Sequence, residues 1–352
     1  MIEISPNKLV NGLKYCCATP IILNLIRKMI SVKDYSHYCN DFLSRVLESD
    51  INQYSGKHRS CFLKSGRDIF LKRNSMKNIL VPYDFSAQSD EAFKVALNVA
   101  AERNAQITLL YIVAIPPIYS GSGEILAVDP IAYDSIAEEA KKKLDKMKAK
   151  APSKSVSIDT EVVYGELVSS VKKTIESKKI DLVIMGTSGT SGLSEAFIGS
   201  NTEKIVRFST VPVLAVRKSF TLKSIKKILV PSTLQLNQTK YIERLKELQD
   251  FFGAKLHILL INTPIHFRTD AEGTEALEEF AKYYELKNYK IHFRSYPREE
   301  DGIIDFAYSE GMDLIAMATH GRKGLAHLFN VSVTENVVNH IQSPIWTFCL
   351  KS

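Results

Sequence analysis

The chain has 352 residues, enough for two domains of ordinary size, and 45% hydrophobic with 24% charged residues is a globular composition. Its formal net charge of +7 is concentrated near the start, because residues 1–75 hold 12 Lys and Arg against 6 Asp and Glu. The other residues therefore carry a net charge of about +1, which argues against a polyanion such as nucleic acid as the partner of the folded part.

Cysteine usage and hydropathy argue against a secreted or membrane protein. The five cysteines, at positions 16, 17, 39, 61 and 349, form no Cys-x-x-Cys pair, which favours a reducing cytoplasm over a disulfide framework or a structural zinc site. The stretch from Ala18 to Ile30 is leader-like, but its uncharged apolar part is about 10 residues, roughly half of what a membrane span needs. We therefore expect neither a signal peptide nor a membrane anchor.

Residues 1–75 show no sustained hydrophobic period, and their polar part is broken by Gly56 and Gly66. Met76 then leads directly into the first convincing strand, at 79–81. We expect residues 1–75 to be an over-extended reading frame whose true start is Met76. The alternative is a basic N-terminal extension, disordered and of unknown role.

From Met76 onward, short apolar runs alternate with amphipathic stretches. Strands are expected at 78–82, 106–113, 156–164, 181–186 and 212–217. Helices are expected at 87–103, 130–150, 167–178 and 201–209. In the first helix Ala92, Ala96 and Val99 recur at helical spacing. Strands separated by helices need crossover connections, which predict an α/β fold with a parallel sheet buried on both faces.

The pattern then repeats after a short polar joint at 219–224. The run Ile-Leu-Val-Pro at 79–82 recurs at 228–231, an offset of 149 residues that falls to about 132 near the ends of the copies. The second copy is therefore shorter. We infer a tandem duplication of one five-stranded domain, with boundaries at 76–218 and 225–352.

A glycine pattern follows the fourth strand of the first copy. Gly186, Gly189, Gly199 and Ser200 give the spacing Gly-x2-Gly-x9-Gly-Ser between a strand and a helix start. With this pattern and the opening Ile-Leu-Val-Pro-Tyr-Asp-Phe-Ser, the chain from Met76 to its end resembles a tandem universal stress protein. The resemblance implies two doubly wound five-stranded parallel sheets of order 3-2-1-4-5, the adenine nucleotide alpha hydrolase-like fold. It also implies pairing of the two domains through their last strands, an intramolecular pseudo-dimer.

The expected ligand site lies where the strand order reverses. Glycines there let the backbone approach a ligand, and the helix that follows offers amides at the positive end of its dipole. The resemblance implies that ATP, with or without Mg²⁺, binds at this place. The residues implied are Pro82, Tyr83, Asp84, Ile112, Gly186, Gly189, Gly199, Ser200, Asn201 and Thr202. Asp84 and Ile112 would contact the adenine, and the later residues the phosphates and ribose.

Each of these features also has a purely structural interpretation. Glycines after a strand often only form turns. Asp84 with Ser86 fits a cap for the helix that begins near Ala87, and Ser200 with Glu203 fits a capping box.

The second copy separates fold from site. It keeps the Ser/Glu pair, at 332 and 335, so that pair belongs to the fold. At the glycine positions it reads Ala318, Gly321 and Val331. Thr233 stands where the first copy has Asp84, and a β-branched valine disfavours the left-handed conformation. We expect the second domain to have lost the nucleotide site and to act as a structural or sensory partner.

Charge within the first loop is unusual for a phosphate site. No Lys or Arg lies between Gly186 and Gly199, and Glu195 adds a negative charge. Phosphate binding would therefore depend on backbone amides and the helix dipole, with Lys204 and Arg207 further along the helix.

The sequence shows no metal or catalytic constellation. Second-domain histidines occur at 257, 266, 292, 320, 327 and 340. They include no pair at the i, i+4 spacing of a zinc helix. No Gly-Lys-Ser/Thr follows the glycines and no Gly-x-Ser-x-Gly elbow is present, so we expect no catalytic residues.

We expect a cytoplasmic universal stress protein that binds ATP in its first domain and regulates a stress response through binding. Two alternatives stay open: an interaction scaffold that binds no nucleotide, and a slow ATPase with Asp84 as its acidic group. The expected partners are an adenine nucleotide and an unidentified protein, with the two domains paired and a homodimer as a further assembly. Neither nucleic acid nor a membrane is expected as a partner.

Overall fold

The computed structural model describes residues 76–114, 118–119, 125–126, 130–149, 156–187, 200–319, 337 and 341–350. Strands and helices alternate through these residues as expected, and every predicted element of the first copy lies within one residue of its predicted bounds. In the first half the order is β1 (Asn78–Pro82), α5 (Ala87–Arg103), β2 (Gln106–Val113), β3 (Ile118–Tyr119), β4 (Ile125–Leu126), α6 (Pro130–Ala149), β5 (Ser157–Tyr164), α7 (Leu167–Ser177), β6 (Leu182–Gly186), α8 (Ser200–Phe208) and β7 (Val213–Val216).

The second half repeats the alternation of strands and helices after a 3₁₀ turn, η2 (Leu222–Ser224). Its elements are β8 (Lys227–Pro231), α9 (Thr239–Phe252), β9 (Lys255–Asn262), η3 (Pro264–His266), α10 (Asp270–Tyr283), β10 (Tyr289–Ser295), α11 (Glu299–Ser309), β11 (Leu314–Thr319) and β12 (Ile345–Cys349). The short antiparallel pair β3–β4 was not predicted, because two-residue strands carry no periodic signal.

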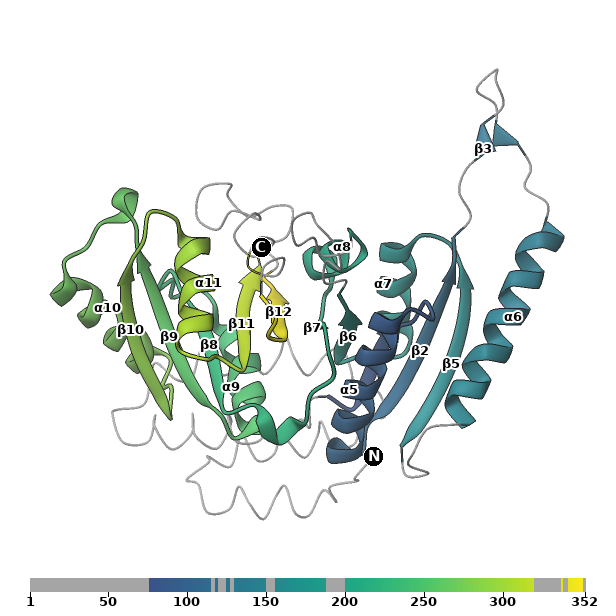
Figure 1. Cartoon of the computed structure of the whole chain (residues 1–352), viewed down its shortest axis with the longest axis horizontal. Coiled ribbons are helices and arrows are strands. Elements are labelled where there is room, and N and C mark those ends of the chain that lie inside the picture. The colour runs from purple at the N-terminus through teal and green to yellow at the C-terminus, as the bar shows by residue number, and fades with distance from the viewer. Residues whose placement is uncertain are drawn as a thin grey trace, which may run out of the picture. The chain divides into compact units, whose positions relative to one another are not determined.

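The two halves share one ten-stranded sheet of order β10-β9-β8-β11-β12-β7-β6-β1-β2-β5 (Figure 1). Each half has the order 3-2-1-4-5 of a doubly wound sheet. All neighbouring strands are parallel except β7 and β12, which pair antiparallel, with Trp346 opposite Leu214. The predicted fold class and the pairing of the two copies through their last strands are confirmed.

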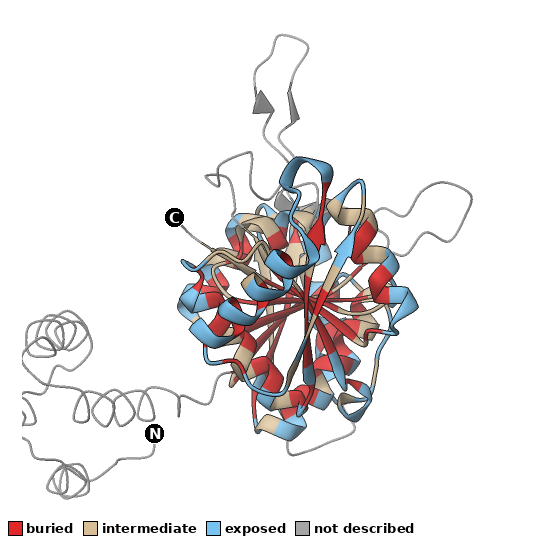
Figure 2. Ribbon diagram, turned by 90° about the vertical axis from the view of Figure 1, so that its left-hand side faces the viewer, coloured by how far each residue is buried: buried red, intermediate tan, exposed pale blue. Residues whose placement is uncertain are grey.

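Helices cover both faces of the sheet, and the strands are buried between them (Figure 2). On the α5 and α9 face one continuous apolar cluster runs through both halves and includes Trp346, which is 1% exposed. On the opposite face each half has its own cluster, under α7 and α8 in the first and under α11 in the second. The halves are therefore joined by a shared core as well as by strand pairing.

The same carboxylate device ties the strands of each half at their amino ends. Asp181 accepts hydrogen bonds from the backbone amides of residues 77 and 78, at 3.0 and 3.1 Å. Asp313 accepts from the amides of residues 226 and 227, at 2.8 and 2.9 Å. Since both copies keep this contact, the aspartate belongs to the fold.

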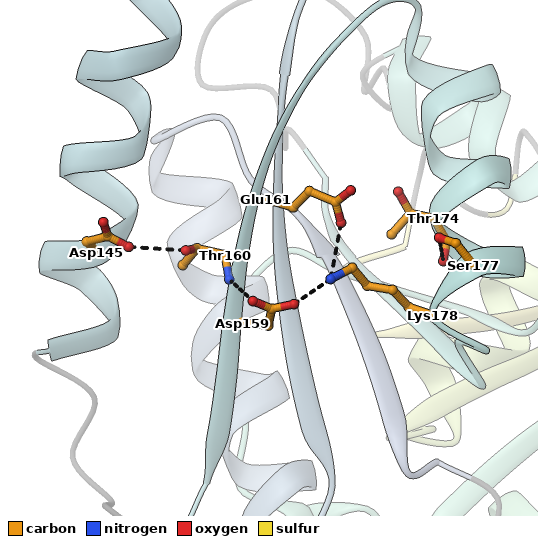
Figure 3. A network of polar contacts seen from close by, with 7 residues as sticks. All are labelled: Asp145, Asp159, Thr160, Glu161, Thr174, Ser177 and Lys178. Carbon is orange, nitrogen blue, oxygen red and sulfur yellow. Dashed lines mark hydrogen bonds and ion pairs between the residues drawn. The ribbon is translucent and has the colours of Figure 1, made fainter.

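A polar network holds the edge strand β5 to the helices on either side of it (Figure 3). Lys178, at the end of α7, forms ion pairs with Asp159 and with Glu161, the latter at 3.4 Å. Thr160 donates to Asp145 of α6 at 3.1 Å. Hydrogen bonding to Lys178 holds the pKa of the Asp159 carboxyl below its usual range. Charged side chains on an edge strand also discourage pairing with other chains.

The start of α5 depends on Ser86 and Gly186. Ser86 caps the helix, because its hydroxyl accepts from the Ser89 amide at 3.2 Å. This first turn lies directly against the end of β6. A Cβ at Gly186 would come closer than 3.0 Å to the backbone carbonyl and the Cβ of Gln88. The absence of a side chain at 186 is therefore required by the packing of α5.

The second half lacks both the serine cap and the glycine. With the offset of 149 residues, the equivalent of Ala87 is position 236, yet α9 begins only at Thr239. Its N-cap, Gln238, makes no side-chain capping bond, and the Tyr284 hydroxyl instead accepts from the Gln238 amide at 3.0 Å. The turn that would meet the end of β11 is not helical, which leaves space for Ala318 at the position of Gly186.

Two histidines lie side by side in the core of the second half. His257 Nδ1 of β9 and His292 Nε2 of β10 are 3.0 Å apart, with the rings stacked at 9°. Both residues are buried, and His292 packs edge-on against Phe306 of α11 at 4.7 Å. Burial lowers the pKa of both histidines, and nearby positive charges such as Lys290 lower it as well. The pKa of His292 falls to about 4.

The glycine contact makes a testable prediction. Gly186→Ala should cost about 1–3 kcal/mol of stability, because the first turn of α5 must move to accept a Cβ. The reverse change in the other copy, Ala318→Gly, should cost less than about 1 kcal/mol, because it removes only one methyl group. Urea unfolding of both variants measures the difference. Equal losses would mean that α5 does not constrain residue 186.

The histidine pair predicts a specific pH dependence. A folded pKa below the unfolded value near 6.5 means that the unfolded chain binds more protons, so this contribution is complete above that pH and is lost as pH falls toward 4. At pH 5 the loss should be about 1–2 kcal/mol. The double variant His257→Leu/His292→Leu should have a shallower decline in urea midpoint between neutral pH and pH 5. Parallel curves for variant and parent would contradict the prediction.

Candidate functional site

The candidate site lies at the carboxyl ends of β1 and β6, which are adjacent parallel strands. The strand order reverses between them: β1 also pairs with β2, and β6 also pairs with β7. The helices that follow cover opposite faces, since α5 packs in the cluster shared by both halves and α8 packs in the cluster with α7. In open α/β sheets this divergence forms the crevice that receives ligands.

Tyr83, directly after β1, turns its side chain into the core. It is 3% exposed, and its hydroxyl donates to Asp90 of α5. Its amide donates to the Leu110 carbonyl at 2.9 Å, which continues the β1–β2 ladder past Pro82. Burial raises the pKa of the phenol. Pro82 and Tyr83 can therefore offer only backbone and ring edge to a ligand.

Asp84 is the exposed polar group at this strand end. Its Oδ1 accepts from the Ser86 amide at 3.0 Å, so it supports the start of α5, although the cap itself is Ser86. Partial burial opposes ionisation, but the hydrogen bonds from Ser86 outweigh it and hold the pKa of the Asp84 carboxyl below its usual range. Asp84 is thus a carboxylate, with a second oxygen that this contact does not use.

The next residue, Phe85, has a left-handed backbone with φ of +64°. Its equivalent in the second half, Leu234, has φ of +63°. Left-handed conformations are costly for side chains of this size, and both copies keep one at this place. The strained turn is therefore a property of the fold and carries no information about a ligand.

Ile112 lies on β2, two residues beyond the last partner of β1. It is half-buried and packs beside the cluster under α7 and α8. Its position next to the strand end that carries Asp84 gives the edge one apolar and one anionic contact. The adenine contact that the family resemblance implies for these two residues stays a prediction.

The N-terminus of α8 is fixed to the end of β6. The Thr202 hydroxyl donates to the Gly186 carbonyl at 3.1 Å, and Thr202 is 2% exposed. Asn201 is exposed in the same first turn, and Ser200 begins the helix. Thr202 therefore positions the helix start, while Gly189 and Gly199 lie outside the described residues.

Cations near this edge come from outside the glycine loop. Lys204 is exposed on α8, and Arg207 forms an ion pair with Glu203 at 3.2 Å. Arg217, which the sequence analysis did not single out, directly follows β7, whose Val216 is paired with Gly186. It is half-buried, and burial lowers the pKa of its guanidinium. The sequence feature that could have identified Arg217 is its position as a charged residue immediately after the last strand of the first copy.

The corresponding edge of the second half has different chemistry. The hydroxyl oxygens of Thr233 and Thr319 are buried and have no hydrogen-bond partner in the described part of the chain. Ser232 accepts from the Leu234 amide at 3.0 Å, the contact closest in form to that of Asp84. Gly321 and Val331 lie outside the described ranges.

The described residues offer neither a metal cluster nor a membrane span. They contain no group of three or more His, Cys, Asp or Glu side chains placed to hold a metal ion. His320 and His327 are not among them. No helix in the described ranges is long and apolar enough to cross a bilayer.

Comparison with known proteins agrees with the fold and its duplication. The profile of the universal stress protein family matches residues 76–217 and again residues 224–348. A universal stress protein of Methanocaldococcus jannaschii is 34% identical over 149 residues, which cover 41% of this chain and 84% of that protein. One from Synechocystis is 24% identical over 291 residues, 78% of this chain and 100% of the relative.

A solved structure has the same architecture. The crystal structure of a universal stress protein from Archaeoglobus fulgidus superposes with a TM-score of 0.64 at 18% identity, covering 78% of this chain and 98% of that one. At this identity the likeness concerns the fold alone. Together with the double profile match, the duplicated doubly wound sheet shows that this chain belongs to the universal stress protein family.

Proposed function

We propose that the first domain binds ATP at the carboxyl ends of β1 and β6, and that the chain regulates a stress response through this binding. The observation that carries the proposal is the asymmetry between the copies. The first has an ionised, exposed Asp84 beside the anchored start of α8, whereas the second has Thr233 and Ala318 at the equivalent places.

The residues present suit an adenine nucleotide. A carboxylate at Asp84 accepts a hydrogen bond from the exocyclic amine of adenine, and Ile112 offers an apolar surface to the ring. The amides of the first turn of α8 suit the phosphates, because the positive end of the helix dipole lies there. Arg217 adds a positive charge from β7 at the same edge of the sheet.

Gly186 supports this proposal less than its place in the motif suggests. Its missing side chain is already required by α5, and the Thr202 hydroxyl is already donated to its carbonyl. Gly189, Gly199, Ser200 and Asn201 therefore carry more of the proposed phosphate contact.

We assign the second domain a structural or sensory role in the same proposal. Its last strand, β12, pairs with β7 of the first domain, and its core is continuous with the core of that domain. This role needs no nucleotide at its own strand ends.

Calorimetry with the full chain tests the adenine contact. ATP should bind more tightly than GTP, because guanine presents a carbonyl oxygen where adenine presents an amine, and that oxygen would face the Asp84 carboxylate. Asp84→Ala should weaken ATP binding by about tenfold, which is about 1.4 kcal/mol, and should remove most of the preference over GTP. Thr233→Ala, the matched change in the second domain, should leave both affinities unchanged.

The other outcomes identify the alternatives. No heat at millimolar ATP would reject nucleotide binding and leave the interaction scaffold. Phosphate release that disappears in Asp84→Ala, while ATP still binds, would make the protein a slow ATPase. Equal effects of the Asp84 and Thr233 variants would place the nucleotide elsewhere.

A further inference from the structure

The loop between β9 and α10, residues 263–269, presents two large apolar side chains to solvent. Ile265 is 87% exposed and Phe267 is 72% exposed. Together they are more exposed than any other large hydrophobic residues in the described part of the chain. Exposing neighbouring apolar side chains to water is unfavourable in free energy, and an interaction partner that covers them would remove this cost.

The exposure is built into a well-fixed loop. The buried Asn262 side chain accepts from the Arg268 amide at 2.8 Å and donates to the Arg268 carbonyl at 3.1 Å, which closes the loop at its base. Within it, the His266 amide donates to the Thr263 carbonyl at 3.1 Å. A reciprocal capping box between Thr269 and Glu272 fixes the exit into α10.

The fixed backbone of the loop holds the side chains of Ile265 and Phe267 in solvent. Asn262 could close the loop around side chains packed inward, but Ile265 and Phe267 point outward instead. A loop held in one conformation loses little entropy when a partner covers it, which favours binding. The loop is therefore preorganised as a contact surface.

Acidic residues surround this loop. The first turns of α10 and α11 meet the same edge of the sheet, since the Tyr296 amide before α11 donates to the Asn262 carbonyl at 3.1 Å. These turns carry Asp270, Glu272, Glu299, Glu300 and Asp301. Glu275 is exposed one turn further along α10. Arg298 forms ion pairs with two of these carboxylates, Glu300 and Asp301, and Arg268 of the loop itself lies close to Glu272. The carboxylates outnumber these two cations, which leaves an excess of negative charge.

We propose that the β9–α10 loop is a docking surface for a basic amphipathic segment of a partner protein, with apolar side chains on Ile265 and Phe267 and Lys or Arg facing the acidic turns. Charge complementarity selects this partner. The carboxylates repel an anionic lipid surface, and the same charges on two copies of the chain would repel each other. The proposal is independent of nucleotide binding in the first domain.

A labelled amphipathic Leu/Lys peptide is the probe for this surface, measured by fluorescence anisotropy with the full chain. Ile265→Ser/Phe267→Ser should weaken binding by about tenfold or more, as expected for central apolar contacts. Glu275→Lys should weaken it several-fold, and added salt should do the same. Ile136→Ser, which removes an exposed apolar side chain of α6 in the first domain, should have no effect.

Thermal unfolding should be unchanged in the double variant, because both side chains are outside the core. A Leu/Glu peptide should bind at least tenfold more weakly than the Leu/Lys peptide. Equal affinity of the double variant and the parent chain for the Leu/Lys peptide would overturn the proposal. Stronger binding to phosphatidylcholine/phosphatidylglycerol vesicles than to the peptide would overturn it in favour of a membrane. Self-association that the double variant loses would overturn it in favour of a second copy.

Discussion

The antiparallel pairing of β7 with β12 is the constraint on which the rest of the structure depends. It covers the edge that each five-stranded half would otherwise expose, and it buries Trp346 in a core common to both halves. Each half therefore has a structural role for the other, whether or not it binds a ligand. The second half can therefore differ from the first in the residues at its strand ends, while its strands keep the same order. Both copies also keep two local features of the strands. These are the aspartates at 181 and 313 and the left-handed residues at 85 and 234.

The two copies differ together at the positions of Ser86 and Gly186, and comparing them shows why each residue is present. Where a serine caps the helix early, the first turn of α5 lies on the strand end and excludes a side chain there. Where Gln235 replaces that serine, α9 starts later and an alanine is accepted. The first glycine of the motif is thus explained by packing. The case for a ligand then depends on Asp84 and on the start of α8.

Much of this fold could be predicted from the sequence, because strands buried on both faces and amphipathic helices have different periods. The duplicated Ile-Leu-Val-Pro openings gave the two halves, and the family resemblance gave the strand order. The histidine pair could not be predicted, since positions 257 and 292 meet only through the β9–β10 register. Nor could the exposure of Ile265, because its sequence context does not distinguish a solvent-facing side chain from a core one.

At the site, sequence identified the strand ends but not the roles within them. Asp84 and Ile112 lie at neighbouring strand ends, whereas the Thr202 hydroxyl is occupied with the Gly186 carbonyl. Arg217 was overlooked because the motif directs attention to the glycine loop. The net charge of residues 76–352, which is only about +1, also concealed a local contrast. One domain offers a helix N-terminus and cations at its strand ends, and the other surrounds its β9–α10 loop with carboxylates. The two copies of one fold thus differ in the charges at their strand ends, which the summed charge cannot reveal.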